Sequence, residues 1–118
     1  MAVRKKSNLN KFFQLRINLK DAPLPIWRRL LVNGDVTLDQ LHEILQLSMG
    51  WSGYHIHHFH FGNTIYGDIA DAKNKKIKDQ TAIKLSDILN EEGDQFIYEY
   101  DLADSWQHEA KVERVVEL

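Results

Sequence analysis

Histidine and acidic side chains occur at two places in the sequence where their spacing suits metal chemistry. One is the segment HIHHFHF, residues 55–61, and the other is the C-terminal region around His108. Histidines at positions i and i+2 project from the same side of a β-strand, so their rings can share one metal ion. A carboxylate and a third imidazole complete a site for a divalent transition metal such as zinc. The candidate metal ligands are His55, His57, Asp101, Asp104 and His108.

Two other interpretations of these histidines stay open. The one we favour is that His55 and His57 are partly buried packing residues, whose ring N–H groups bond backbone carbonyls or Asp104. The other is acid–base catalysis, because histidine titrates near neutral pH. His58 and His60 are expected on the opposite face of the strand, as surface groups.

Tryptophan and arginine side chains are candidates for binding. Trp27, Trp51 and Trp106 are interpreted as core or interface anchors, because large amphipathic rings dominate both environments. Arg28 and Arg29 are adjacent, so they point to opposite faces of a strand. We expect one of them to pair with an internal carboxylate, with anion binding as the alternative.

The elements that would position these residues follow from hydropathy patterning. Alternation predicts strands over 13–19 and 26–32, separated by Pro23 and Pro25. A capping box at Thr37–Gln40 predicts a helix with Leu38, Leu41, Leu45 and Met49 on its apolar side, ended by Gly50. The histidine segment 55–61 follows, with a tight turn at 62–63 into a short partner strand.

The second half of the chain is predicted in the same way. Residues 67–80 are polar and lysine-rich, which is typical of a surface loop. A two-turn helix is predicted over 85–93, and two strands close the chain. The predicted fold is α+β, a mostly antiparallel sheet of about five to six strands with two helices packed on one face, in the order ββαβ(β)αββ.

Composition fits one soluble domain. The 118 residues are 43% apolar and 27% charged, and we expect a flexible basic tail over 1–10 and a single α+β domain over 11–118. The sequence has no cysteine, which excludes disulfides and thiolate metal sites. We expect a cytoplasmic protein with no membrane contact, because there is neither a signal-peptide core nor an apolar run of ~20 residues. The net charge of -2 gives no general attraction to nucleic acid.

Five sequence blocks, in order, resemble the plasmid pRiA ORF-three-like family. They are Pro25-Ile-Trp-Arg-Arg29, Thr37-Leu-x-x-Leu-His42, Met49-Gly-Trp51, His55-Ile-His57-x-Phe59 and Tyr98-Glu-Tyr-Asp101-x-x-Asp104-x-Trp106-x-His108, and the similarity covers about residues 12–115. The resemblance implies an α+β fold and a prokaryotic protein of plasmids and mobile elements, without an implied reaction. In the closing turn, Ala103 and Ser105 depart from the family pattern.

The resemblance also implies a set of signature positions. Six of them are candidates for binding, and the other five coincide with the candidate metal ligands named above. The six binding candidates are Trp27, Arg28, Arg29, His42, Trp51 and Trp106.

Two functions follow as hypotheses. The preferred one is a non-enzymatic binding or interaction module for an unidentified protein or nucleic-acid partner, because no phosphate-binding loop, nucleophile elbow, zincin helix or EF-hand motif occurs. The alternative is a metal-dependent hydrolase or nuclease in which the His/Asp set activates a bound water. Both hypotheses require the histidine strand and the Trp106 strand to be neighbours within one sheet.

Overall fold

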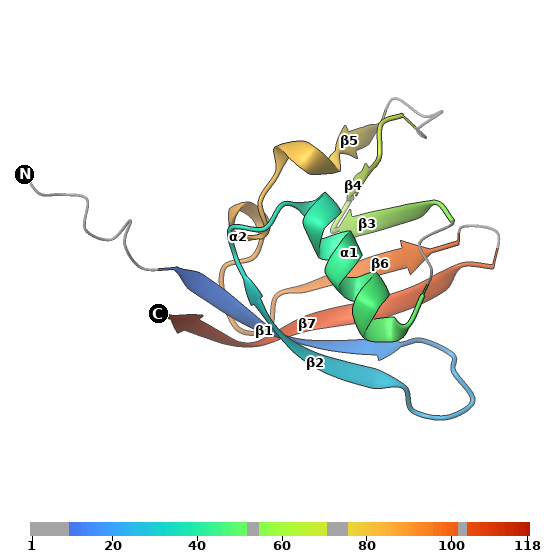
Figure 1. Ribbon diagram of the computed structural model, residues 1–118, viewed down its shortest axis with the longest axis horizontal. Coiled ribbons are helices and arrows are strands. Elements are labelled where there is room, and N and C mark those ends of the chain that lie inside the picture. The colour runs from blue at the N-terminus through green and yellow to red at the C-terminus, as the bar shows by residue number, and fades with distance from the viewer. Residues whose placement is uncertain (1–9, 52–54, 71–75, 102–103) are drawn as a thin grey trace, which may run out of the picture.

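The computed structural model describes residues 10–51, 55–70, 76–101 and 104–118, which form one twisted sheet with a helix across one face (Figure 1). The sheet order is β2-β1-β7-β6-β3-β4-β5. Along the chain the elements are β1 (Lys11–Leu19), β2 (Trp27–Asn33), α1 (Leu38–Met49), β3 (His57–Phe61), β4 (Thr64–Gly67), β5 (Ile77–Asp79), the 3-10 turn η2 (Gln80–Ala82), α2 (Leu85–Ile88), β6 (Gln95–Tyr100) and β7 (Trp106–Glu117).

The predicted fold class was wrong in the number and direction of the strands and in the extent of the helices. The described residues form a seven-stranded mixed sheet, not a mostly antiparallel sheet of five to six strands with two helices packed on one face. The extra strand is β5, which pairs parallel with β4 and lies inside the segment predicted to be a loop. Of the two α-helices in the described chain, α2 has only four residues. The predicted basic tail lies outside the described residues, except for Asn10.

β1 is a central strand because it pairs antiparallel with β2 on one side and with β7 on the other. Its alternating pattern places Phe13, Leu15 and Ile17 in the core, each fully buried. The register with β7 shifts between Gln14 and Leu15, which leaves Glu113 as an extra residue on β7. Glu113 accepts hydrogen bonds from Arg29 and Gln14 on the open face of the sheet.

The predicted helix is present as α1 and packs Leu38, Leu41 and Leu45 into the core. The backbone N–H of Thr37 donates to Oε1 of Gln40, which is one half of the predicted capping box, whereas the Thr37 hydroxyl donates to Asp39. Gly50 ends the helix in the left-handed conformation, as predicted.

Backbone hydrogen bonds with residues 83–86, at the start of α2, fix the start of α1. Leu38 donates its backbone N–H to Ile83, and Leu85 donates to Val36. The backbone at Gly34 is equally enclosed, because its N–H donates to Lys11 and its carbonyl accepts from Ser86. These bonds fix where α1 begins relative to the edge of the sheet.

β3 and β4 form the predicted hairpin across Gly62 and Asn63. The odd-numbered residues of β3 face inward as predicted, with His57 and Phe59 buried. Within the described chain, no helix is long and apolar enough to cross a bilayer.

Gly34 is expected to tolerate no side chain. A Cβ there would lie 2.8 Å from the backbone oxygen of Lys11 and 3.0 Å from side-chain atoms of Phe13 and Ser86. Because a backbone atom cannot move aside cheaply, Gly34→Ala is expected to lower the free energy of unfolding by about 1–3 kcal/mol in urea denaturation. The exposed neighbour offers a matched control, Asp35→Ala, expected to change stability by less than about 0.5 kcal/mol. Equal effects of the two substitutions would contradict this packing.

Candidate functional site

The histidine strand and the Trp106 strand lie in the same sheet with one strand between them. β6 pairs with β3 on one side and with β7 on the other. The ring of Tyr98 on β6 lies 6.0 Å from the ring of His57 on β3 and 5.3 Å from the ring of His108 on β7, measured between centroids. Tyr98 therefore separates two of the predicted metal ligands.

His108 uses both ring nitrogens in structural hydrogen bonds. Its Nε2 accepts from the indole Nε1 of Trp51 at 3.2 Å, so its Nδ1 carries the proton and donates to the carbonyl of Tyr98 at 3.1 Å. The ring is fully buried, and burial lowers the pKa of His108 although hydrogen bonds with Tyr98 and Trp106 oppose this effect. His108 anchors Trp51 and offers no lone pair to a metal.

Two of the other predicted ligands approach each other. His55 Nδ1 lies 3.8 Å from Oδ2 of Asp101, and the His55 side chain is 55% exposed. Asp104 is exposed, and its backbone N–H lies 3.5 Å from Oδ1 of Asp101. In the described part of the chain, no three of the five predicted ligands bring their ligand atoms within 4.8 Å of one another.

The structure instead stacks two histidines from different elements. The rings of His42 on α1 and His57 on β3 lie 3.6 Å apart at an interplanar angle of 8°. His42 is 9% exposed and His57 is 8% exposed. Two protonated imidazoles at this separation would repel each other strongly, so the pair is expected to carry at most one positive charge near neutral pH.

Hydrogen bonds determine which nitrogen of each ring carries the proton. The Tyr98 hydroxyl accepts from the amide of Gln46 at 2.7 Å and therefore donates to Nδ1 of His42, also at 2.7 Å. The proton of neutral His42 consequently lies on Nε2, which is 4.0 Å from Oε2 of Glu43. His57 donates from Nε2 to Oε1 of Gln80 at 2.7 Å.

Burial keeps His42 and Tyr98 neutral. It lowers the pKa of His42 to about 4, with a smaller contribution from the neighbouring His57, and Asp39 opposes both. Burial also raises the pKa of Tyr98 above that of a free phenol, so its hydroxyl stays protonated. At physiological pH the imidazole of His42 is therefore neutral.

A pocket of about 380 Å³ opens above the stacked rings. It lies where α1, the start of β3, the end of β4 and η2 meet. Three carboxylates belong to its lining, and among the described residues no lysine or arginine does. The lining residues are Asp39, His42, Glu43, His55, His57, Asp68 and Gln80.

Beside this pocket lies an aromatic cluster formed by Trp51, Tyr100, Trp106 and His55. The Trp51 ring lies 5.4 Å from Tyr100 and 5.8 Å from Trp106, and His55 packs edge-on against Tyr100 at 5.6 Å. His55 also lines the pocket, so it connects the two features. Trp106 is 37% exposed and gives the cluster a surface.

The remaining predicted binding residues have structural contacts. Trp27 lies beside the guanidinium groups of Arg16 and Arg29, at 4.1 and 5.3 Å from its ring centroid. Arg29 pairs with the carboxylate of Glu113 through two hydrogen bonds of 2.7 and 3.0 Å. Arg28 donates to the carbonyl of Ser48 in the last turn of α1.

Three residues of the site, Asp68, Gln80 and Tyr98, were not predicted from the sequence. Gln80 and Asp68 fall in the segment read as a loop, and Tyr98 fits the pattern of an ordinary core residue. One signal was available: His42 and Gln46 are four residues apart beside the apolar side of α1, so two polar groups share one buried patch of the helix.

The model of the family described as plasmid pRiA4b ORF-3-like protein matches residues 11–118. The chain belongs to this family. It is 29% identical over 102 residues to the uncharacterized protein y4hQ of Sinorhizobium fredii, covering 86% of this chain and 53% of that protein. The chain thus spans about half the length of this curated relative.

A solved structure shares the fold. The crystal structure of MM3350, a protein of unknown function from Methanosarcina mazei Go1, matches with a TM-score of 0.80 and 27% identity over 92% of this chain and 62% of that one. The names of both relatives assign them no function.

The depressed pKa of His42 predicts that acid destabilises the fold. The unfolded chain binds a proton at His42 near pH 6.5, whereas the folded chain does so near pH 4. Between these values the unfolded state holds more protons, so the free energy of unfolding falls as the pH is lowered through this window, by up to about 3 kcal/mol from this residue. His42→Gln removes this contribution, and urea denaturation from pH 7 to 4 should show a shallower slope. His108 acts in the same sense, so part of the slope remains. A slope unchanged by His42→Gln would contradict the argument.

Proposed function

We propose that this protein is a non-enzymatic binding module whose pocket receives a basic side chain, lysine or arginine, of a protein partner. The observation that carries this proposal is the charge of the lining. Asp39, Glu43 and Asp68 contribute carboxylates, and within the part of the chain that the structure describes no lysine or arginine belongs to the lining. Because His42 is neutral at physiological pH, it does not offset this negative charge. A volume of about 380 Å³ suits one side chain or a small ligand.

The carboxylates keep acceptor capacity for a ligand. Asp39 accepts from the Thr37 hydroxyl and Asp68 from the backbone N–H of Ala70, and in the bonds formed between described residues each carboxylate uses one oxygen. The side chain of Glu43 is 76% exposed. A charge-assisted hydrogen bond contributes roughly 1.5–3 kcal/mol, so two such bonds would give a specific but modest affinity.

The aromatic cluster adds contact area next to the pocket. Partly exposed aromatic rings are enriched at protein interfaces, because they bury a large surface at a low cost in conformational entropy. Trp106 has this character, and contacts running through Trp51, Tyr100 and His55 connect it to the pocket wall. A partner segment that places a basic side chain in the pocket can therefore pack its neighbouring residues on Trp106.

Two observations disfavour the other candidates. A nucleic-acid backbone would bring phosphates against three carboxylates, which repel it. A metal-dependent hydrolase built on His55, His57 and His108 needs free nitrogen lone pairs, but His108 has both nitrogens in hydrogen bonds within the fold.

Small probes test the pocket directly. N-acetyl-lysine methylamide and N-acetyl-arginine methylamide, added at millimolar concentrations, should shift the NMR resonances of Asp39, Glu43, Asp68 and the Gln80 side-chain amide, whereas N-acetyl-glutamate methylamide should not. Combining Glu43→Gln with Asp68→Asn should reduce binding at least tenfold, because both changes remove acceptor charge without changing shape.

The control for this experiment is Glu109→Gln, which removes a carboxylate at an exposed position of β7 outside the pocket lining. It should bind the cationic probes as the parent protein does. Equal shifts with the anionic probe, or full binding by the double variant, would overturn the proposal.

A further inference from the structure

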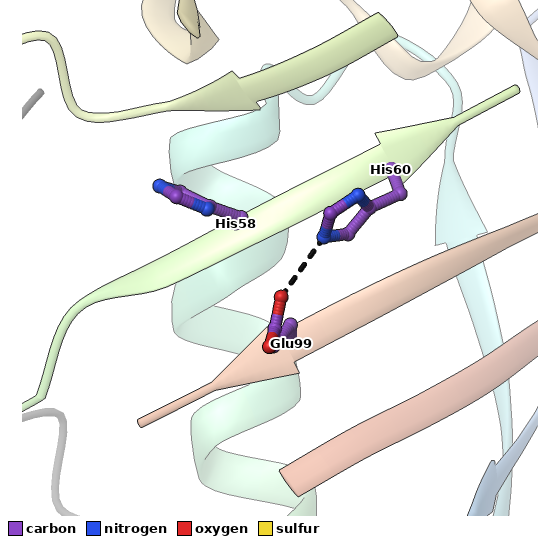
Figure 2. A group of neighbouring side chains, drawn as sticks. All are labelled: His58, His60 and Glu99. Carbon is purple, nitrogen blue, oxygen red and sulfur yellow. Dashed lines mark hydrogen bonds and ion pairs between the residues drawn. The ribbon is translucent and has the colours of Figure 1, made fainter. Parts of the chain in front are cut away.

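The open face of the sheet carries a second group of ligand-bearing side chains. His58 and His60 project from β3 on the side away from α1, and Glu99 projects beside them from β6 (Figure 2). His58 and Glu99 are directly paired across the two strands. One nitrogen of each imidazole and one oxygen of the carboxylate all lie within 4.8 Å of one another, and this is the one such group of three among the described residues.

The geometry points to a mononuclear site for a divalent transition metal, formed by His58, His60 and Glu99. Two imidazoles and one carboxylate are a donor set suited to Zn²⁺, Fe²⁺ or Co²⁺, with the remaining coordination positions open to water. The site differs from the acidic pocket in its face and in every residue, so it is independent of the proposed function.

Glu99 is already oriented as a ligand. Its Oε2 accepts from the Ser105 hydroxyl at 2.7 Å, and its Oε1 lies 3.0 Å from Nε2 of His60. Gln107 in turn donates to the Ser105 hydroxyl at 3.4 Å. Such outer hydrogen bonds fix the direction of a metal-ligating carboxylate. They also keep the group ionised: although burial raises the pKa of Glu99, the bonds with Ser105 and His60 lower it overall.

His58 has room to serve as a ligand. Its partner on β4 is Gly67, and a Cβ at that position would lie 3.0 Å from Cδ2 of the imidazole. Burial lowers the pKa of His58, with a smaller contribution from His60, and Glu99 opposes them, so the ring is neutral and keeps a lone pair at neutral pH. Ligand atoms on one zinc ion are roughly 3.3 Å apart, so a side-chain rotation of His58 closes the set. On binding at Nε2 of His60, the metal takes the place of the contact with Glu99, and the ring proton moves through solvent to Nδ1, so the ligand is a neutral imidazole.

The site is tested by titrating the untagged protein with Zn²⁺ in calorimetry and with Co²⁺ in visible absorption. We expect one equivalent bound with a Kd below about 10 µM and d–d bands typical of a nitrogen- and oxygen-ligated ion. Binding should weaken at least tenfold in each of three variants, His58→Gln, His60→Gln and Glu99→Gln. Ser105→Ala should weaken binding by a smaller factor, because it removes only a hydrogen bond that orients Glu99.

The matched control is His55→Gln, which removes a histidine that lies near a carboxylate on the other candidate site. It should leave binding unchanged. NMR of the parent protein gives a second measurement that needs no variant, because Zn²⁺ should shift the ring resonances of His58 and His60 and leave those of His42 and His108 in place. The proposal is overturned by the absence of saturable binding below about 100 µM, by binding that survives any of the three ligand substitutions, or by its loss in His55→Gln.

Discussion

The buried hydroxyl of Tyr98 is the contact on which the arrangement of the candidate pocket depends. A hydroxyl buried without a partner would cost several kcal/mol, and this one is satisfied by two side chains of α1, Gln46 and His42. Both bonds join the helix to β6, so they fix how far along the sheet the helix lies and which side it turns inward. The stacking of His42 on His57, and with it the floor of the pocket, follows from that position.

Other contacts hold the two ends of the same helix. At its start, the backbone around Gly34 and Val36 is bonded to the segment leading into α2, and at its end Arg28 donates to Ser48. The two faces of the sheet then differ in chemistry. The helix side presents the stacked rings of His42 and His57 below an acidic rim. The open side presents ion pairs and, on β3 and β6, the group His58, His60 and Glu99 (Figure 2). A single strand, β3, contributes histidines to both faces because its side chains alternate.

The sequence predicted those parts of the fold in which local patterns are strong. The alternation in β1, the helix from Leu38 to Gly50 and the hairpin across Gly62 all depend on short-range signals, and the structure contains each of them. β5 was missed because three residues in a lysine-rich segment carry no periodicity, and its pairing with β4 is decided by tertiary contacts. The site was only partly predictable for the same reason. His57 and His42 were singled out, but their stacking depends on where a helix crosses a sheet. The role of Tyr98 was hidden by an alternating pattern that fits any core tyrosine.

Hydrogen bonds with Tyr98 and Gln80 hold the rings of His42 and His57 in defined tautomers. Long-range proton–nitrogen NMR of the imidazole rings at pH 7 measures this most directly. We expect His42 to carry its proton on Nε2 alone, with Nδ1 accepting from the Tyr98 hydroxyl, and His57 to carry a proton on Nε2. A proton on Nδ1 of His42 would mean that the ring donates to Tyr98 and that the amide of Gln46 is reversed, which would contradict the account.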